Sequence, residues 1–132
     1  MAASPIFVGI PRHECGYANT TSTSRDTNAP TGVVDIFTAG ASGSRIDKIS
    51  VKILSTVNVA SGVWIWIKKS SNYYLLEEIV LAAPGTVGAT VEAGEVSNYY
   101  PEGIIIPSGA IVAATVSLGT QMANVHIFGG DF

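Results

Sequence analysis

The stretch SGVWIWIKKSSNYYLLEEIVL, from Ser61 to Leu81, is the part of the sequence that decides the fold. Two runs rich in β-branched and aromatic residues flank the polar corner Ser70-Ser71-Asn72, a pattern typical of a β-hairpin. Helix is the competing interpretation for Leu75–Leu81, but the strand that precedes this segment favours the hairpin. Side chains alternate between the faces of a strand, so one face of the first run carries Val63, Ile65 and Ile67 and the other carries Trp64 and Trp66. A strand that is apolar on both faces needs two packing partners, and we expect another subunit to be the second.

Further strands are predicted on both sides of this hairpin. The glycine-rich turn GASGS, at Gly40–Ser44, leads into a strand and not a helix, which argues against a phosphate-binding loop. We expect a break at Gly16, loops or loose strands over residues 17–32, 55–60 and 86–95, and a docked C-terminal tail. Strands are indicated at residues 6–10, 33–39, 45–53, 96–100, 104–106, 110–117 and 122–128, in addition to the hairpin.

This pattern of short strands without a convincing helix predicts the fold class and the domain organisation. The spacing favours an all-β, antiparallel jelly-roll sandwich of about eight strands, occupying residues 31–132. We expect residues 1–30 to form an N-terminal arm or an edge segment. A chain of 132 residues is long enough for one such domain with a single core.

Composition restricts the classes of partner. Only 13% of the residues are charged and the net charge is −3, which argues against nucleic acid as a partner because phosphate binding needs a concentrated basic patch. No apolar run approaches the length of a membrane helix, and the first residues lack the features of a signal peptide. Cys15 is the single cysteine, so we expect neither an internal disulfide nor a cysteine zinc site. These features predict a protein that is assembled in a cytoplasm.

No arrangement of chemically active residues predicts an enzyme. The two histidines, His13 and His126, lack the His-x-His spacing of jelly-roll metalloenzymes. The adjacent Glu77 and Glu78 point to opposite faces of a strand, so they cannot act together on one substrate. We therefore expect no catalytic residues, no cofactor and no bound metal.

The aromatic residues are the remaining candidates for a functional surface. Large aromatic side chains dominate the energetics of subunit interfaces, but they also form cores and stack against sugars. The interpretation we favour is subunit contact, with a carbohydrate-binding jelly roll of a phage tail or fibre as the alternative. The interface candidates are Trp64, Trp66, Tyr73, Tyr74, Tyr99, Tyr100 and Phe132.

Two segments, TGVVDIFTAGASGSRIDKI at Thr31–Ile49 and NVHIFGGDF at Asn124–Phe132, carry a family resemblance. They resemble segments of small proteins encoded by tailed bacteriophages and prophages. The resemblance implies a virion component, a jelly-roll decoration or cement protein of the capsid, which in this family is often trimeric. It leaves residues 1–30 and 73–96 unplaced, and it implies no catalytic or binding residue because the shared motifs mark turns and strands.

Taken together, these observations predict a structural virion protein. We expect a capsid decoration or cement subunit that stabilises a phage head, assembled as a homotrimer in the host cytoplasm. Its partners would be further copies of itself and the major capsid protein or another virion protein, and neither nucleic acid nor a membrane.

Overall fold

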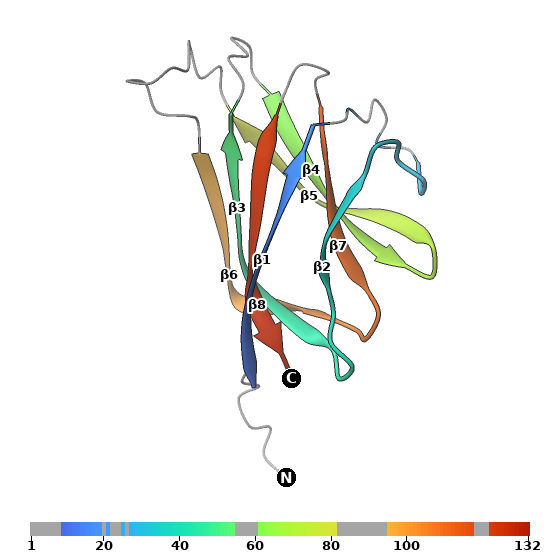
Figure 1. Cartoon of the computed structure of the whole chain (residues 1–132), viewed down its shortest axis with the longest axis vertical. Helices are drawn as coiled ribbons and strands as arrows, with labels where there is room; N and C mark the ends of the chain where they lie inside the picture. The colour runs from blue at the N-terminus through green and yellow to red at the C-terminus, as the bar shows by residue number, and fades with distance from the viewer. Residues whose placement is uncertain are drawn as a thin grey trace.

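The computed structural model describes residues 9–19, 21, 25, 27–54, 61–81, 95–117 and 122–132. Eight strands form two four-stranded antiparallel sheets that pack face to face (Figure 1). The first sheet has the order β1-β8-β3-β6 and the second has the order β2-β7-β4-β5. The strands are β1 (Ile10–Ala18), β2 (Val34–Thr38), β3 (Ser44–Ile53), β4 (Ser61–Lys69), β5 (Asn72–Leu81), β6 (Glu95–Ile106), β7 (Ile111–Val116) and β8 (Ala123–Asp131).

The strand order confirms the predicted jelly roll. β1 pairs with β8, β2 with β7, β3 with β6 and β4 with β5, so the chain is one long two-stranded ribbon wrapped around a core. The β4–β5 hairpin is the closed end of that ribbon. The stretch Ser61–Leu81 is therefore the point at which the chain reverses and from which the other pairs follow.

The hairpin has the geometry that its sequence predicts. Lys69 pairs with Asn72, and the two serines between them both have positive φ, 50° at Ser70 and 72° at Ser71. Two successive residues with positive φ are typical of a type I′ turn, whose twist matches that of the flanking strands. A bulge follows in β5, where the partner of Ile65 is Glu77 and the partner of Trp66 is Leu75.

The core lies between the two sheets and follows the predicted alternation. Ile49, Val51 and Ile53 of β3 face inward and are fully buried, as are Val63 and Ile65 of β4. From β7, the buried side chains of Val112, Ala114 and Val116 complete the facing layer. Each large aliphatic side chain buried in this way stabilises the fold by roughly 1.5–3 kcal/mol.

Two strands differ from the expectation. β1 runs without a break through Gly16, as an edge strand paired with β8, so the sandwich extends to the N-terminal side of residue 31. Proline at position 11 is tolerated there because an edge strand has one unpaired side. β6 is one strand from Glu95 to Ile106, where two shorter strands were expected, and Gly103 with φ 72° accommodates its irregularity. Of the predicted segments, residues 6–8, 55–60 and 86–94 lie outside the described residues.

A polar corner fixes the C-terminus, which confirms the docked tail. The Asp131 carboxylate accepts a hydrogen bond from Ser44 Oγ at 2.5 Å and pairs with Arg12 Nη1 at 2.9 Å. Arg12 also donates to the Thr38 carbonyl at 2.7 Å, so the corner connects β1, β2, β3 and β8. The backbone N–H of Phe132 donates to the Gly43 carbonyl at 3.2 Å.

Asp131→Asn is expected to destabilise the protein in a way that depends on pH. Hydrogen bonds from Ser44 and Arg12 lower the pKa of Asp131 below its usual value. The charged form therefore stabilises the folded state above the unfolded-state pKa of about 3.9, and this contribution is lost as the pH falls through the lower folded pKa. Urea titrations should show a lower unfolding midpoint for the variant at pH 7, and the gap from wild type should narrow as the pH falls below the unfolded-state pKa of about 3.9. Glu14→Gln, which keeps the partners of Asp131, is the control, and a gap that stays constant as the pH falls would contradict the assignment.

Candidate functional site

Trp64 and Trp66 lie on the outer face of the second sheet and are buried within the single chain. Trp66 is fully buried and its indole N–H donates to Thr115 Oγ1 at 3.0 Å, while Trp64 is 7% exposed. The two rings meet edge to face at 6.4 Å, and Ala113 lies in the same cluster. The alternation that places them opposite Val63 and Ile65 is confirmed, but the chain itself covers this second apolar face. Burial of the two rings therefore does not require another subunit.

The cover is a strap, defined here as Arg25 and residues 27–33. The Arg25 guanidinium lies over the Trp64 ring, 5.3 Å from its centre, and forms an ion pair with Glu78. The backbone carbonyl of Asn28 accepts a 2.8 Å hydrogen bond from the N–H of Tyr73, and Val33 packs beside the tryptophans. Residues 17–32 were predicted as loops or loose strands because they have no apolar periodicity, and no sequence signal indicated that this segment covers the tryptophans.

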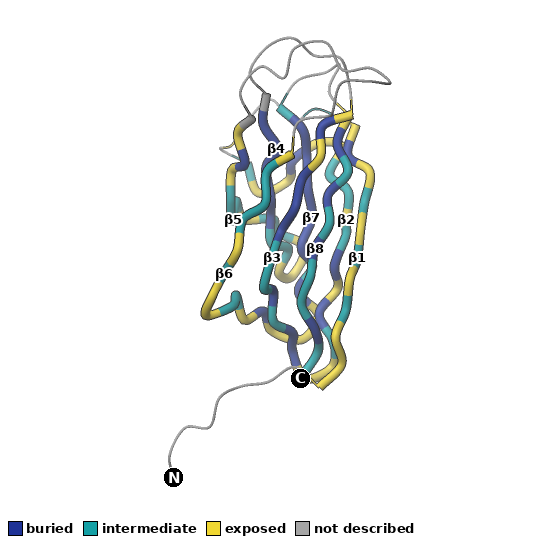
Figure 2. Tube along the Cα trace, turned by 90° about the vertical axis from the view of Figure 1, so that its left-hand side faces the viewer, coloured by how far each residue is buried: buried dark blue, intermediate teal, exposed yellow. Residues whose placement is uncertain are grey.

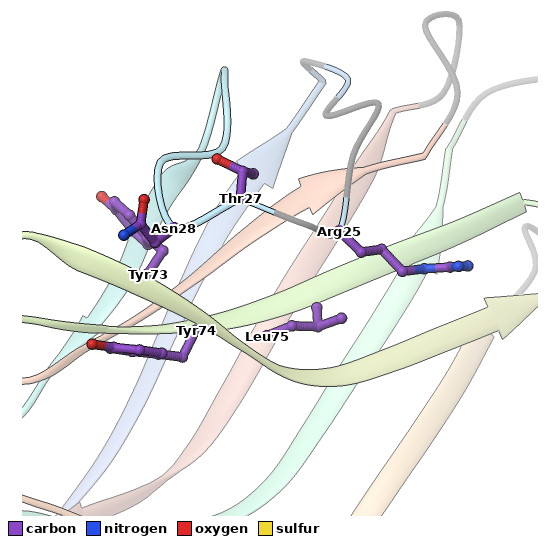
Figure 3. Close-up of a pocket in the computed structure, with 6 residues that line it drawn as sticks. All are labelled: Arg25, Thr27, Asn28, Tyr73, Tyr74 and Leu75. Carbon is purple, nitrogen blue, oxygen red and sulfur yellow. The ribbon is translucent and has the colours of Figure 1, made fainter.

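A polar hollow of about 630 Å³ lies between the strap and β5 (Figure 3). Figure 3 shows Tyr73 turned toward Asn28 and Tyr74 on the opposite side of the β5 ribbon, as expected for neighbouring strand residues. The Tyr73 hydroxyl donates to Asp35 at 3.0 Å, and burial followed by this hydrogen bond raises the pKa of Tyr73. Tyr74 is 52% exposed. The polar groups of the hollow suit a hydrated ligand, whereas the exposed ring of Tyr74 projects from the other side of β5 (Figure 3). Its lining residues are Arg25, Thr27, Asn28, Tyr73, Tyr74 and Leu75.

The remaining three interface candidates lie elsewhere. Tyr99 is on the outer face of the first sheet and is 68% exposed. Tyr100 points inward, packs against the core and donates from its hydroxyl to Glu77 Oε2 at 3.4 Å, which connects β6 to β5. Phe132 lies half-buried at the polar corner. The seven candidates therefore do not form one surface.

A late ionisation is expected from Tyr100. Burial, followed by the nearby Glu77 carboxylate, raises the pKa of Tyr100 to about 12. The neutral phenol is thus favoured in the folded state, and its contribution to stability is complete below the unfolded-state pKa of about 10 and is lost as the pH rises through 12. In an ultraviolet titration, Tyr100→Phe should remove a step near pH 12, whereas Tyr99→Phe should leave it. A step that survives Tyr100→Phe would assign the late phenol to another tyrosine.

The outer face of the first sheet brings together residues that local sequence patterns left apart. One cross-strand row contains His13, Phe128, Lys48 and Tyr99, from the four strands in order. His13 stacks on Phe128 with 4.3 Å between ring centres, and Lys48 Nζ lies 5.0 Å from the Phe128 ring and 5.1 Å from the Tyr99 ring. Such contacts between a cation and an aromatic ring are attractive.

The two histidines meet on this same face. His13 Nε2 and His126 Nδ1 are 2.9 Å apart, so the imidazoles share a hydrogen bond. Sequence analysis missed this pair because His13 and His126 are far apart in the chain and meet only through the β1–β8 register. In the described part of the chain, no group of three or more His, Cys, Asp or Glu residues is arranged to hold a metal ion. The described residues also include no helix long and apolar enough to span a membrane.

Comparison with known proteins gives only distant structural likenesses. No protein-family model matches the chain, and no curated protein sequence matches it. The crystal structure of tomato aspermy virus has 7% sequence identity and a TM-score of 0.44, covering 100% of this chain and 83% of that chain. Dimeric latent PorU from Porphyromonas gingivalis has 10% identity and a TM-score of 0.43, covering 97% of this chain and 13% of PorU. Similarities at this level carry no argument about function, and the jelly-roll assignment rests on the strand order.

Proposed function

We propose that this chain is a structural virion protein, a capsid decoration or cement subunit that stabilises a phage head through contacts with itself and with the capsid. The observation that supports this most is the position of the two segments that resemble phage proteins. Thr31–Ile49 and Asn124–Phe132 are far apart in sequence, yet β3 pairs with β8 along its length and Ser44 bonds to Asp131. The resemblance therefore falls on one connected corner of the fold and not on two unrelated fragments.

The proposed mechanism is adhesion without catalysis. A subunit that bridges neighbouring capsid proteins stabilises the assembled shell because it binds the assembled state and not the separated subunits. The exposed side chains available for contacts with other copies of the chain or with the capsid include Tyr99, Tyr17 and Ile105, with 68%, 46% and 54% of their surface accessible. Each is large enough to anchor an interface when it becomes buried.

Cryo-electron microscopy of native particles that carry the chain tests this proposal. Jelly-roll density at the junctions between major capsid subunits is the expected result. Particles that lack the chain, or that carry it only on a tail or fibre, would refute the capsid role. Light scattering tests self-association independently, since a stable 13.7 kDa monomer at all concentrations would remove the homo-oligomeric part of the proposal.

Carbohydrate binding is the second candidate, and the hollow beside the strap favours it. Trp66 is fully buried and cannot stack on a sugar, so the half-buried Tyr73, whose ring faces the strap (Figure 3), takes that role in this alternative. Because Arg25 lies over Trp64, a glycan in the hollow should change tryptophan fluorescence. A glycan that shifts the wild-type fluorescence, but not that of Asn28→Ala with Tyr73→Ala, would support this candidate. A flat glycan-array response would remove it.

A further inference from the structure

The outer face of the first sheet is the broad surface that no other described residue covers. Figure 2 looks onto this side of the molecule, where β6, β3, β8 and β1 lie next to one another. The outer face of the second sheet differs, because the strap covers its two tryptophans and leaves Val80, 68% exposed, beyond the covered part. The free edges of the first sheet are poor sites for adding a strand, since β1 contains Pro11 and β6 contains Pro101 and a left-handed Gly103. Contacts made by the first sheet should therefore use its face.

We infer that this face pairs with the same face of a second copy of the chain, through a two-fold axis parallel to the strands. The inference rests on the proposed function, because it assigns the homo-oligomeric contact within it, as a two-fold dimer in place of the homotrimer that the sequence resemblance implies. In an isologous contact the same patch serves both copies and must be complementary to itself. A two-fold axis parallel to the strands places β1 of one copy against β6 of the other, and β8 against β3. Each row of side chains that crosses the four strands therefore faces the same row of the second copy, read in the opposite direction.

The aromatic row is complementary to itself under this symmetry. Its order is His13, Phe128, Lys48 and Tyr99, so each end of the row meets the opposite end of its copy. Lys48 faces the Phe128 ring of the second copy, and the exposed ring of Tyr99 faces the His13 imidazole of the second copy. The contact thus repeats between copies the cation–ring and ring–ring contacts that each chain already makes within itself.

A second row of side chains, nearer the other end of the strands, is also complementary to the same row of the second copy. Its order is Tyr17, Asn124, Lys52 and Glu95. After reversal, the Tyr17 hydroxyl, which donates to Met122 Sδ at 2.7 Å within its own chain, faces a stronger acceptor, the Glu95 carboxylate of the second copy. Lys52 faces the Asn124 amide of the second copy. Both are donor–acceptor pairs.

The other in-plane two-fold axis, perpendicular to the strands, fits less well. It would place the aromatic row on the second row and bring Lys48 directly against Lys52 of the second copy, at a cost from like charges. Four strands about 4.8 Å apart and strands about 30 Å long give a face of roughly 570 Å² per copy. The total of roughly 1,100 Å² lies at the lower end for specific interfaces, which indicates a reversible dimer.

Chemical cross-linking tests the register of the pair. Cys15 is exposed on β1 and Ser97 lies in the same row on β6, so the two-fold axis places Cys15 opposite Ser97 of the second copy. Within one chain these positions are three strand spacings apart, about 14 Å. In Ser97→Cys, dibromobimane, which becomes fluorescent when it joins two nearby thiols, should yield a fluorescent dimer band on a denaturing gel. Ser108→Cys in the exposed β6–β7 turn is the matched control, and equal dimer yields from the two variants would overturn the inference.

Analytical ultracentrifugation of single-site variants tests how much individual side chains contribute to dimer formation. Wild type should show a reversible species of twice the 13.7 kDa chain mass, and Tyr99→Ser should weaken its formation by about tenfold. Tyr74→Ser removes another exposed tyrosine from the hairpin, away from this face, and should leave dimerisation unchanged. A wild-type species of three times the chain mass, a monomer at all concentrations, or equal effects of the two substitutions would overturn the inference.

The same variants separate this inference from the proposed function. If Tyr99→Ser dimerises normally and native particles still carry the chain at capsid junctions, the assigned face is wrong and the capsid role stands. If wild type forms the expected cross-linked dimer but the particles lack the chain, the face is correct and the virion role fails.

Discussion

Trp66→Ala is expected to lower the free energy of unfolding by about 3–5 kcal/mol, the range for removing a fully buried large aromatic side chain. Trp66 has no exposed surface and packs with Trp64 and Ala113 between the second sheet and the strap. The substitution opens a cavity and also leaves the buried Thr115 hydroxyl without the indole donor. Both effects act within the folded chain, so the loss should appear at every protein concentration in urea unfolding experiments.

Two further variants define what the indole contributes. Trp66→Phe keeps most of the apolar volume but removes the hydrogen bond to Thr115, so it should cost less than the alanine variant. Tyr74→Ala, at a position 52% exposed on the same hairpin, should change stability by no more than about 0.5 kcal/mol. If Trp66→Ala instead left unfolding unchanged and only dissociated an oligomer, the ring would be an interface residue and the strap would not be its native cover.

The alternation of side chains predicted most of the fold because each strand carries its own inward and outward pattern. The inward sets of β3, β4 and β7 follow directly from residues such as Val51, Ile65 and Ala114. A jelly roll also follows from the number of strands and the lack of helices. The limits of β1 and β6 were less predictable. Gly16 interrupts a local pattern, but pairing with β8 continues β1 through it. In β6 the strand runs through Pro101, although residues 100–103 have no partner in β3.

The candidate site was harder to predict from the sequence, because it depends on the pairing register of β1 with β8 and on the strap that covers the tryptophans. The cover over Trp64 is held by the backbone hydrogen bond from Tyr73 to Asn28 and by one arginine, and neither has a periodic signature. The pairing of His13 with His126 requires the first and last strands to be neighbours in one defined register. Spacing along the chain carries no information about either contact, so the aromatic residues were assigned to one surface although they occupy several.

Gly129→Ala is expected to destabilise the fold by about 3 kcal/mol, at the upper end for overpacking, because the added methyl group would collide with backbone and not with a movable side chain. A Cβ at position 129 would lie 1.9 Å from the carbonyl oxygen of Arg45, far inside van der Waals contact. β3 already has a bulge between Ile46 and Lys48 opposite this position, so β8 approaches β3 closely there. The variant must push the two central strands of the first sheet apart, which also weakens the Asp131 corner two residues further on.

Gly9→Ala is the matched control, because its Cβ would meet only the Asp131 carbonyl oxygen at an ordinary 3.7 Å. Urea unfolding and amide exchange along β3 and β8 measure the effect, and equal stabilities for the two variants would show that the strands separate at this point without cost.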